Sequence, residues 1–486
     1  MVAAQFIRGR IIHHINPRYY KWVVASVVGF GVLTSTLDGS ITNMALPFLA
    51  EEFNTDASVI VWISISFLLA SIGVILTLGS LGDSIGRKRV FLTGFIVFGI
   101  GLILAPLSRT LPFLFFGRTV QGVGQAMIVS NGNALLVQSF PDNQRGTALG
   151  IENAVVGVGL ASGPSIAGLI LENWDWQALF YFRVPFIIIF FILGVIYLNK
   201  DGQNNSQFKF DIYGSITLFI TMTCFLLAIT FGRSYGWISA WTIIPFCIVP
   251  VSFALFIFAE SKAKFPVLEL KLFKSRLFSF ANAANSLQFL SQGAIIILLP
   301  FFLLDARNLR PKTAGLILGT LPVVRLIVGP LAGWSADKVQ SIKITTFGLI
   351  IMGFAYYFLG NIGLETHLGL LVLVLLVEGT GTSIFGPANN SAIMGSVPQR
   401  YLGTASGMIA TVRQGSMATG IAISGTFYSI FLAEKSTELA SRGLTPELVS
   451  RMSSSHGFQQ VLNIMIVTLV IATLVSLLRG KDTVHR

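Results

Sequence analysis

The chain has 486 residues, of which 53% are hydrophobic and only 11% are charged, and its mean hydropathy is +0.76. Soluble proteins carry about 25% charged residues, and a soluble core of this length cannot bury so much apolar surface. A large soluble protein is therefore excluded, and most of the chain is expected to lie in lipid. The net charge of +12 is interpreted as a membrane-topology signal and not as a nucleic-acid-binding surface.

Apolar runs divide the chain into fourteen expected membrane-spanning helices. A helix needs roughly 20 mostly apolar residues to cross a hydrocarbon core of about 30 Å, whereas spanning strands would alternate over roughly ten residues. The predicted fold class is therefore an all-α polytopic membrane protein. The expected spans are 22–48, 59–80, 90–107, 112–139, 147–171, 178–198, 211–232, 241–260, 277–304, 313–334, 344–361, 368–393, 402–431 and 458–478.

Two polar connections, 199–210 and 260–276, divide the spans into groups of six, two and six. A third connection, 432–457, is rich in Ser and Glu and is expected to be an outer loop with room for a short helix. The predicted divisions are an N-terminal segment, a six-helix bundle, two additional spans with their flanking loops, a second six-helix bundle and a tail. These cover 1–21, 22–198, 199–276, 277–478 and 479–486.

The distribution of Lys and Arg predicts the orientation. With fourteen spans, 21 of these residues fall in the termini and the even-numbered loops, 8 fall in the other loops and 4 fall within spans. Positive residues concentrate in cytoplasmic loops, so a multi-pass protein of the cell membrane with both termini in the cytoplasm is expected. Arg307, Arg310 and Lys312 lie together on the opposite side and depart from this pattern.

The loop after the second span has glycines on both sides of an acid, followed by three cations. It reads Gly79-Ser-Leu81-Gly82-Asp83-Ser84-Ile-Gly86-Arg87-Lys88-Arg89. Small residues let helix ends approach closely, and an acid can pair with cations or cap a helix N-terminus. A degenerate copy that contains Gly333 and Asp337 follows the tenth span, as expected for a duplicated six-helix half.

Further motifs follow in chain order. They are Leu37-Asp38-Gly-Ser-Ile-Thr-Asn43-Met-Ala-Leu-Pro47, Arg118-Thr-Val-Gln121-Gly122, Gly159-x-x-x-Gly163-Pro164 and Arg413-Gln-Gly415. With the loop motif, they resemble the signatures of the major facilitator superfamily and of its fourteen-span drug:proton antiporter branch, over nearly the whole chain. The resemblance implies two six-helix bundles around a central cavity, with two additional spans, that rock between inward-open and outward-open states.

The resemblance assigns conformational change to the loop motif, its copy and the motif of the fifth span. Glycine and proline let a helix approach a neighbour closely and bend, although glycine-rich spans are also ordinary in membranes. Gly82, Ser84 and Ala167 depart from the usual family residues. The candidate conformational residues are Gly79, Gly82, Asp83, Gly86, Arg87, Lys88, Gly159, Gly163, Pro164 and Asp337.

Ionisable residues within spans are rare because they are costly in a membrane, so each one is first interpreted as a functional residue. A carboxyl group in a cavity of low dielectric can take a proton on one side of the membrane and lose it when the cavity rehydrates. Asp38 is the first candidate for a proton carrier, with Arg118 as its partner, and Glu152 and Glu378 are further proton-coupling candidates. Glu378 also suits a substrate site. The alternatives for these residues are a structural ion pair, a helix cap or a hydrogen bond to backbone carbonyls.

A second set of polar residues in spans is expected to line the substrate cavity: Asn43, Gln121, Arg183, Arg325, Asn389 and Arg413. Arg183 stands where the branch normally has Asn, and Arg325 has no counterpart in its motifs. Three interpretations stay open for these two arginines. They are neutralised by Glu152 and Glu378, they bind an anionic headgroup or carboxylate, or they extend to the membrane surface.

The predicted function is a proton-coupled secondary active transporter, not an enzyme, that exports lipophilic or amphipathic compounds by alternating access, as multidrug antiporters do. The expected partners are a lipophilic small molecule, protons and the bilayer, with one chain functional as a monomer. No cofactor and no metal are expected, because the five His lie in termini or loops and no Walker loop is present.

Three alternatives compete with this function. The same fold could carry an amphipathic anion or a lipid, with Arg183 and Arg325 holding its headgroup. A lipid-modifying membrane enzyme would need clustered His, Asp or Glu at one membrane face, which no loop provides. A transporter-like receptor would bind its ligand without turnover.

Overall fold

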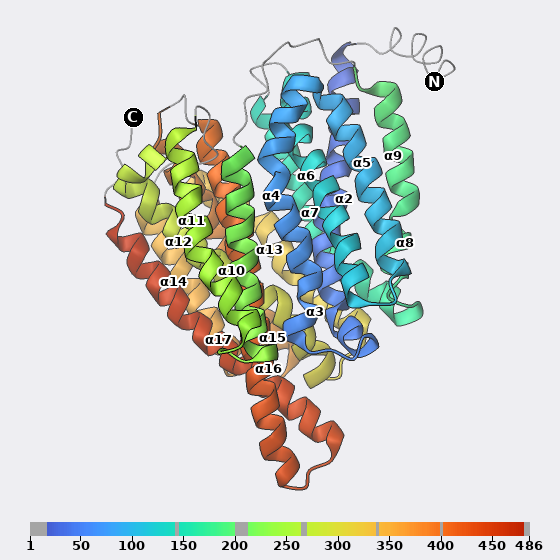
Figure 1. Ribbon diagram of the computed structural model, residues 1–486, viewed down its shortest axis with the longest axis vertical. Helices are drawn as coiled ribbons and strands as arrows, with labels where there is room; N and C mark the ends of the chain where they lie inside the picture. Colours follow the sequence, from blue (N-terminus) through green and yellow to red (C-terminus); the bar gives the residue numbers. More distant parts are fainter. Residues whose placement is uncertain are drawn as a thin grey trace.

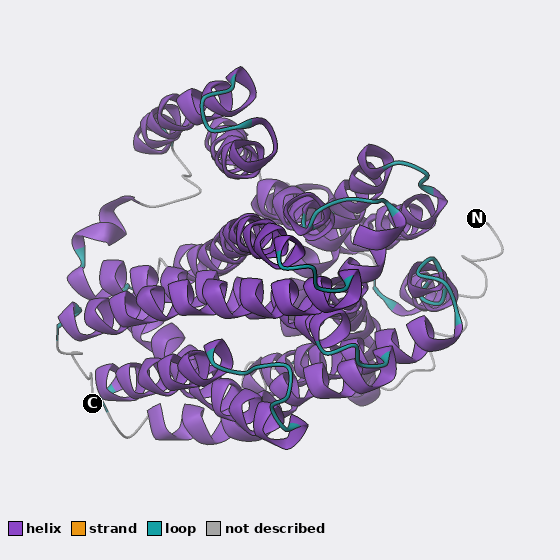
Figure 2. Cartoon of the chain, turned by 90° about the horizontal axis from the view of Figure 1, so that it is seen from below, coloured by secondary structure: helices purple, strands orange, loops and turns teal. Residues whose placement is uncertain are grey.

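The computed structural model describes residues 17–140, 145–199, 212–263, 270–336, 340–398 and 402–480. Every regular element in these ranges is a helix (Figures 1 and 2). Helices form because a backbone in lipid must satisfy its own hydrogen bonds. The predicted all-α fold class is confirmed for the described chain.

The helices follow the expected order of spans. The first six spans correspond to α2 (Pro17–Glu52), α3 and α4 (Ala57–Ile60 and Trp62–Ile85), α5 (Arg87–Leu104), α6 (Leu111–Ser139), α7 (Arg145–Asn173), and α8 and α9 (Ala178–Tyr181 and Val184–Tyr197). The next two are α10 (Ile212–Tyr235) and α11 (Ala240–Lys262). The last six are α12 (Arg276–Phe301), which continues into the π-helix η4 (Phe302–Ala306), α13 (Pro311–Ala336), α14 (Ser341–Gly360), α15 (Leu368–Gly395), α16 (Leu402–Ser441) and α17 (Pro446–Leu478).

Thirteen segments of the described chain are long and apolar enough to cross a membrane. The remaining expected span, 112–139, folds as α6, which has 29 residues but is not one of the thirteen. Its polar residues include Arg118, Gln121 and Asn131, all of which are buried. α6 packs against α4, α5 and α2, so these polar side chains face protein and not lipid.

The helices pack in two groups. α2, α4 to α6, α8 and α9 contact mainly one another, and so do α12 and α14 to α17, whereas α7 and α13 pack on each other about as much as on their own groups. The two groups meet where α7 packs against α13, where α2 packs against α12, and where α3 and α4 pack against α16. α10 contacts both α4 and α16, while α11 packs mainly on α10, and the two lie side by side in front of the other helices in Figure 1.

Small residues bring α7 and α13 close together. Gly315 of α13 faces the backbone carbonyl of Pro164, and Gly168 of α7 faces the backbone of Pro311. The hydroxyl of Ser165 donates to the carbonyl of Gly315 at 3.5 Å. A side chain at either glycine would push the two helices apart, so this seam depends on residues without a Cβ.

The other face of α7 packs against α2. Gly159 faces the side chain of Thr36, and Gly163 faces the side chain of Ser40, whose hydroxyl also lies 3.4 Å from the carbonyl of Gly159. Thr36 and Ser40 flank Asp38 on α2. α7 therefore connects the turn of α2 that carries Asp38 with α13 of the other group.

The connection 432–457 is mostly helical, because α16 extends to Ser441 and α17 begins at Pro446. The two ends form a helical hairpin that projects beyond the other helices (Figure 1). Glu438 pairs with Lys435 at 2.7 Å and with Arg442 at 2.6 Å, and such i,i+3 and i,i+4 pairs favour helix. The expected outer loop thus contains more helix than predicted. We call this end of the molecule the hairpin end.

Two cations near the hairpin end bond to backbone carbonyls where helices end. Arg307 donates to the carbonyl of Gly363 at 2.9 Å, and Arg451 donates to that of Ala306 at 3.1 Å. Cations near helix C-termini are favourable, which gives Arg307 a local reason to depart from the charge pattern. α2 begins and α17 ends at the opposite end of the molecule, which we call the terminal end (Figure 1).

Candidate functional site

A buried cluster in the first group of helices joins Asp38 of α2, Arg118 and Gln121 of α6, and Arg183, which directly precedes α9. One carboxylate oxygen of Asp38 lies 2.5 Å from Nη1 of Arg118. The other accepts hydrogen bonds from Gln121, at 3.2 Å, and from Arg183. Asp38, Arg118 and Gln121 are 0% exposed and Arg183 is 2% exposed. The structure thus brings four predicted site residues into direct contact.

Local structure orients both arginines. Arg118 and Gln121 are three residues apart and share one face of α6, and Arg118 Nη1 donates to Gln121 Oε1 at 2.7 Å. Nε of Arg118 donates to the carbonyl of Ile63 in α4 at 3.1 Å. Nε of Arg183 donates to the carbonyl of Leu179 in α8 at 3.0 Å. The cluster therefore ties together α2, α4, α6 and the α8–α9 connection.

This cluster contains two guanidinium groups and one carboxylate, so its formal charge is +1. Nη2 of Arg183 has no hydrogen-bond partner within the described chain. Arg183 forms an ion pair with Asp38, because the α8–α9 connection places Arg183 beside α2. Glu152 lies in α7, and its side chain is outside the described part of the structure.

A second polar cluster lies in the other group of helices, around Glu378 of α15. Thr382 donates to one carboxylate oxygen of Glu378 at 2.9 Å. Arg325 of α13 follows Val324, which contacts Gly379 next to Glu378. Tyr356 of α14 donates to the carbonyl of Ser291, next to Gln292, at 2.7 Å. With its amide oxygen turned toward Arg325, Gln292 of α12 accepts hydrogen bonds from both terminal nitrogens of that arginine. Four helices thus contribute to this cluster.

Close helix packing brings Glu378 beside Arg325. Gly379 of α15 faces the carbonyl of Leu321 and the side chain of Val324 on α13, so the two helices approach where the charged residues lie. Glu378 is 1% exposed, whereas Arg325 is only half-buried. Oε2 of Glu378 and Nε of Arg325 have no hydrogen-bond partner within the described residues.

The other cavity candidates lie elsewhere. Asn43 accepts a hydrogen bond from Ser64 of α4 at 2.7 Å, which joins α2 to α4. Asn389 donates to the carbonyl of Ala281 at 3.1 Å and accepts from Arg479 at 3.4 Å. These bonds connect α12, α15 and the end of α17, about 16 Å along α15 from Glu378 at 1.5 Å per residue. Asn389 therefore has packing partners and is not part of the Glu378 cluster.

Arg413 is exposed on α16. Its predicted role in the cavity stays a prediction.

Two glycines of the loop motif let α4 pack closely against α6. Gly82 of α4 faces the side chain of Asn131 in α6, and Gly79 faces Ser130. Nδ2 of Asn131 donates to the carbonyl of Leu78 at 3.1 Å. Among the other motif residues, the side chain of Asp83 and the whole of Asp337 lie outside the described residues.

Lys88 of the loop motif is buried and closes the end of α9. Gly86 connects α4 to α5 with a φ of 112°, a conformation that favours glycine. Lys88 then donates to the carbonyl of Val195 at 2.9 Å and to that of Leu198. The ammonium group therefore bonds to two carbonyls at the C-terminus of α9, where a cation is favourable.

Lys88→Met is expected to lower the stability of the purified protein by about 1.5 to 3 kcal/mol, because it removes charge-assisted hydrogen bonds to buried carbonyls. Thermal unfolding in detergent measures this. Arg89→Met, at the exposed neighbouring position, is the matched control and should unfold close to wild type. Equal unfolding temperatures for the two variants would contradict this role of Lys88.

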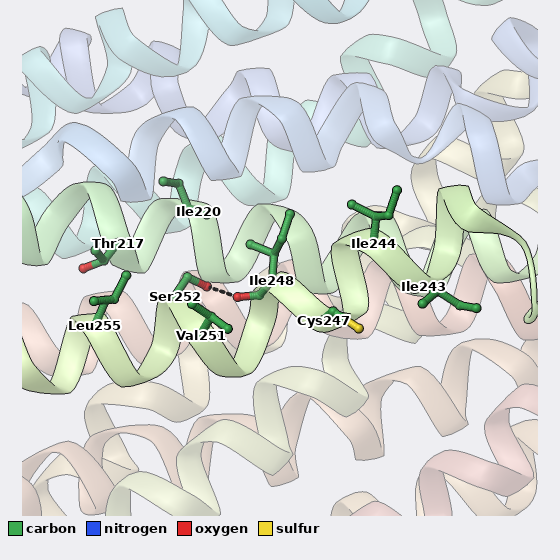
Figure 3. Close-up of a pocket in the computed structure, with 9 residues that line it drawn as sticks. All are labelled: Thr217, Ile220, Ile243, Ile244, Cys247, Ile248, Val251, Ser252 and Leu255. Carbon is green, nitrogen blue, oxygen red and sulfur yellow. Dashed lines mark hydrogen bonds between the residues drawn. The ribbon is translucent and has the colours of Figure 1, made fainter.

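A groove with a volume of about 560 Å³ lies between α10 and α11 (Figure 3). Aliphatic side chains such as Ile220, Ile244 and Leu255 line it, and the hydroxyls of Thr217 and Ser252 are bonded to their own helices. The hydroxyls of this lining are already bonded within the two helices, and we do not assign the functional site to the groove. No group of three or more His, Cys, Asp and Glu within the described ranges is placed to hold a metal.

Sequence reasoning missed Gln292, Tyr356 and Thr382. A signal for Gln292 was present, because Asp83 and Asp337 of the two loop motifs are 254 residues apart and the same interval separates Asp38 from Gln292. The two halves thus place an acid and an amide at equivalent positions, and an arginine bonds to each.

Comparison with known proteins identifies the family. Residues 28–421 match the family model described as Major Facilitator Superfamily. The chain is 34% identical over 420 residues to the riboflavin transporter RibZ of Clostridioides difficile, covering 86% of this chain and 89% of that protein. It is 29% identical over 441 residues to the multidrug efflux pump LfrA of Mycolicibacterium smegmatis, covering 90% and 86%.

The fold is similar to that of a bacterial homologue of the human lysosomal transporter Spinster, solved in an inward-facing and unoccupied conformation. The TM-score is 0.65 at 15% identity, and the match covers 95% of this chain and 97% of that one. With the family match over most of the chain and the apolar helices described above, the chain belongs to the Major Facilitator Superfamily and is a multi-pass membrane transporter of small molecules, not an enzyme.

Proposed function

We propose that this protein is a proton-coupled exporter of lipophilic or amphipathic compounds that works by alternating access. The observation that carries the proposal is the Asp38 cluster, in which one buried carboxylate holds two arginines from different helices. A proton taken up by Asp38 removes the only negative charge of this cluster. Arg118 and Arg183 would then face each other as like charges in a medium of low dielectric, where repulsion is strong. Protonation therefore favours rearrangement of α2, α6 and the α8–α9 connection.

The contacts of α7 give this rearrangement a route to the other half of the molecule. Thr36 and Ser40, which flank Asp38, pack against glycines of α7, and the opposite face of α7 packs against α13. A shift of α2 therefore displaces α7 at its contact with α13, where the two groups of helices meet. A proton that moves down a potential of 100 mV supplies about 2.3 kcal/mol, so one or two protons suffice to drive export of a neutral or cationic compound.

Contacts at the hairpin end support assignment of this structure to a state closed at that end. The backbone nitrogen of Ser58 in α3 donates to the hydroxyl of Ser429 in α16 at 3.1 Å. Gly425 of α16 faces Val61 and the carbonyl of Ala57. With the predicted orientation, in which the terminal end is cytoplasmic, this state is inward-facing.

The relatives support two classes of cargo. Similarity to a multidrug efflux pump at 29% identity favours lipophilic drugs, and similarity to a riboflavin transporter at 34% identity favours a flavin as the second candidate. An anionic lipid held by both Arg183 and Arg325 has less support, because Arg183 is already paired with Asp38.

Transport in reconstituted vesicles tests the proposal. Purified protein would be assayed with an imposed pH gradient against cationic, neutral and anionic lipophiles and against riboflavin. We expect movement of at least one lipophile against its gradient, coupled to inward proton flow and abolished by a protonophore. Transport of every cargo at rates independent of the pH gradient would refute proton coupling. Transport of riboflavin alone would favour the second candidate.

A further inference from the structure

We infer that Gln292, Arg325 and Glu378 form a recognition site for a neutral polar group that offers a hydrogen-bond donor beside an acceptor, as the edge of an amide or imide does. The inference rests on the proposed function, because it names the part of the cargo that the second helical group would bind. The site is distinct from the Asp38 cluster, which lies in the other group of helices.

The first argument is unused hydrogen-bonding capacity. Oε2 of Glu378 accepts nothing and Nε of Arg325 donates to nothing within the described chain, although Glu378 is 1% exposed. Polar atoms buried without partners are costly, more so in a membrane, where water does not compete. The N–H of a bound amide or imide would donate to Oε2 of Glu378, and the neighbouring C=O would accept from Nε of Arg325.

The second argument is charge. The Asp38 cluster has an excess positive charge, but at the equivalent position of the second cluster Gln292 replaces the acid. One guanidinium and one carboxylate remain, so this cluster is formally neutral. A cationic ligand group is attracted by Glu378 but repelled by Arg325, and the reverse holds for an anionic group, so a net charge gains little from this pair. A neutral group with both hydrogen-bonding functions meets neither penalty.

The third argument is position. Arg325 is half-buried, whereas the arginines of the Asp38 cluster are 0% and 2% exposed. Its neighbour Leu326 faces Gly157 of α7, which places Arg325 on the turn of α13 at the seam between the two groups of helices. Arg325 is therefore more accessible from the contact between the two groups than Arg118 or Arg183. The hydroxyl of Tyr356 already donates to the carbonyl of Ser291 at 2.7 Å and is not available to it.

A pair of fluorescent probes tests the site. 1,8-Naphthalimide carries the imide N–H between two carbonyls, and N-methyl-1,8-naphthalimide has nearly the same shape without the donor. We expect the purified protein in detergent to bind the N–H compound at least about tenfold more tightly, because the methylated compound leaves the carboxylate of Glu378 unsatisfied. Fluorescence titration at equilibrium, without a pH gradient, gives both dissociation constants.

The variants Glu378→Met and Arg325→Met should each reduce the affinity ratio of the two probes to near one. The double variant removes both charges together, a change that protein cores tolerate better than removal of one partner, and it should show the same loss while remaining folded. Glu365→Met, at an exposed acid after α14, is the control and should keep the wild-type ratio.

Two outcomes would overturn the site. One is a wild-type protein that does not prefer the N–H compound, including one that binds neither probe. The other is a wild-type ratio retained in a folded Glu378→Met protein. Because binding is measured without a gradient, selective binding by a protein that shows no pH-driven transport would refute proton coupling and leave this site standing.

Discussion

Asp38→Asn is expected to abolish transport driven by a pH gradient while leaving substrate binding largely intact. The amide cannot carry a proton, and it leaves Arg118 and Arg183 without a counter-charge in a fully buried cluster. Removal of one partner from a buried ion pair costs about 3 to 5 kcal/mol of stability, so thermal unfolding should also occur at a lower temperature. Uptake by reconstituted vesicles and thermal unfolding in detergent measure the two effects.

A second variant separates proton coupling from stability. In Asp38→Asn combined with Arg183→Gln, one positive charge is removed together with the negative charge, so the cluster keeps its formal charge of +1. This double variant should recover much of the lost stability but none of the gradient-driven transport. Asp175→Asn, at an exposed acid, should behave like wild type. Unchanged gradient-driven transport by the Asp38→Asn protein would remove Asp38 from the mechanism.

Gly315→Val is expected to reduce the transport rate at least about tenfold by opening the seam between α7 and α13. A side chain at this position meets the backbone carbonyl of Pro164, which cannot move without displacing α7. Overpacking of a tight contact costs about 1 to 3 kcal/mol. Here it raises the free energy of the conformation in which α7 and α13 are in contact. The equilibrium should shift away from the closed hairpin end.

Gly353→Val is the matched control for that substitution. Gly353 is also within a helix, α14, and a Cβ at this position meets no atom within 4 Å. Both variants place a β-branched residue in a helix, so intrinsic helix propensity affects them equally. Transport rates and unfolding temperatures that are the same for the two variants would show that the seam does not limit turnover.

Much of the fold was predictable, because its causes are local. Runs of about 20 apolar residues determine a spanning helix wherever they occur, and the described helices follow the order of the expected spans. α6 shows where composition is insufficient. Its buried face carries Arg118 and Gln121, and a helix shielded by neighbours does not need the hydropathy of one that faces lipid.

The candidate site was only partly predictable, because its contacts are tertiary. The sequence singled out Asp38 and Arg118, which are charged residues within apolar runs and are in direct contact. It did not identify Asp38 as the partner of Arg183, because the two residues are 145 positions apart in the chain. Asn389 was as conspicuous in the sequence as Asn43, yet its partners lie on α12 and after α17, which no local pattern indicates.

The projecting hairpin of α16 and α17 has a practical consequence for imaging. α16 has 40 residues and is therefore about 60 Å long at 1.5 Å per residue, twice the thickness of the hydrocarbon core. Small transporters are hard to align in electron micrographs because a detergent micelle hides their outline. An asymmetric feature that projects beyond the other helices marks the orientation of each particle, and the exposed turn at Gly443 offers a place to attach an antibody fragment or a fused helical domain.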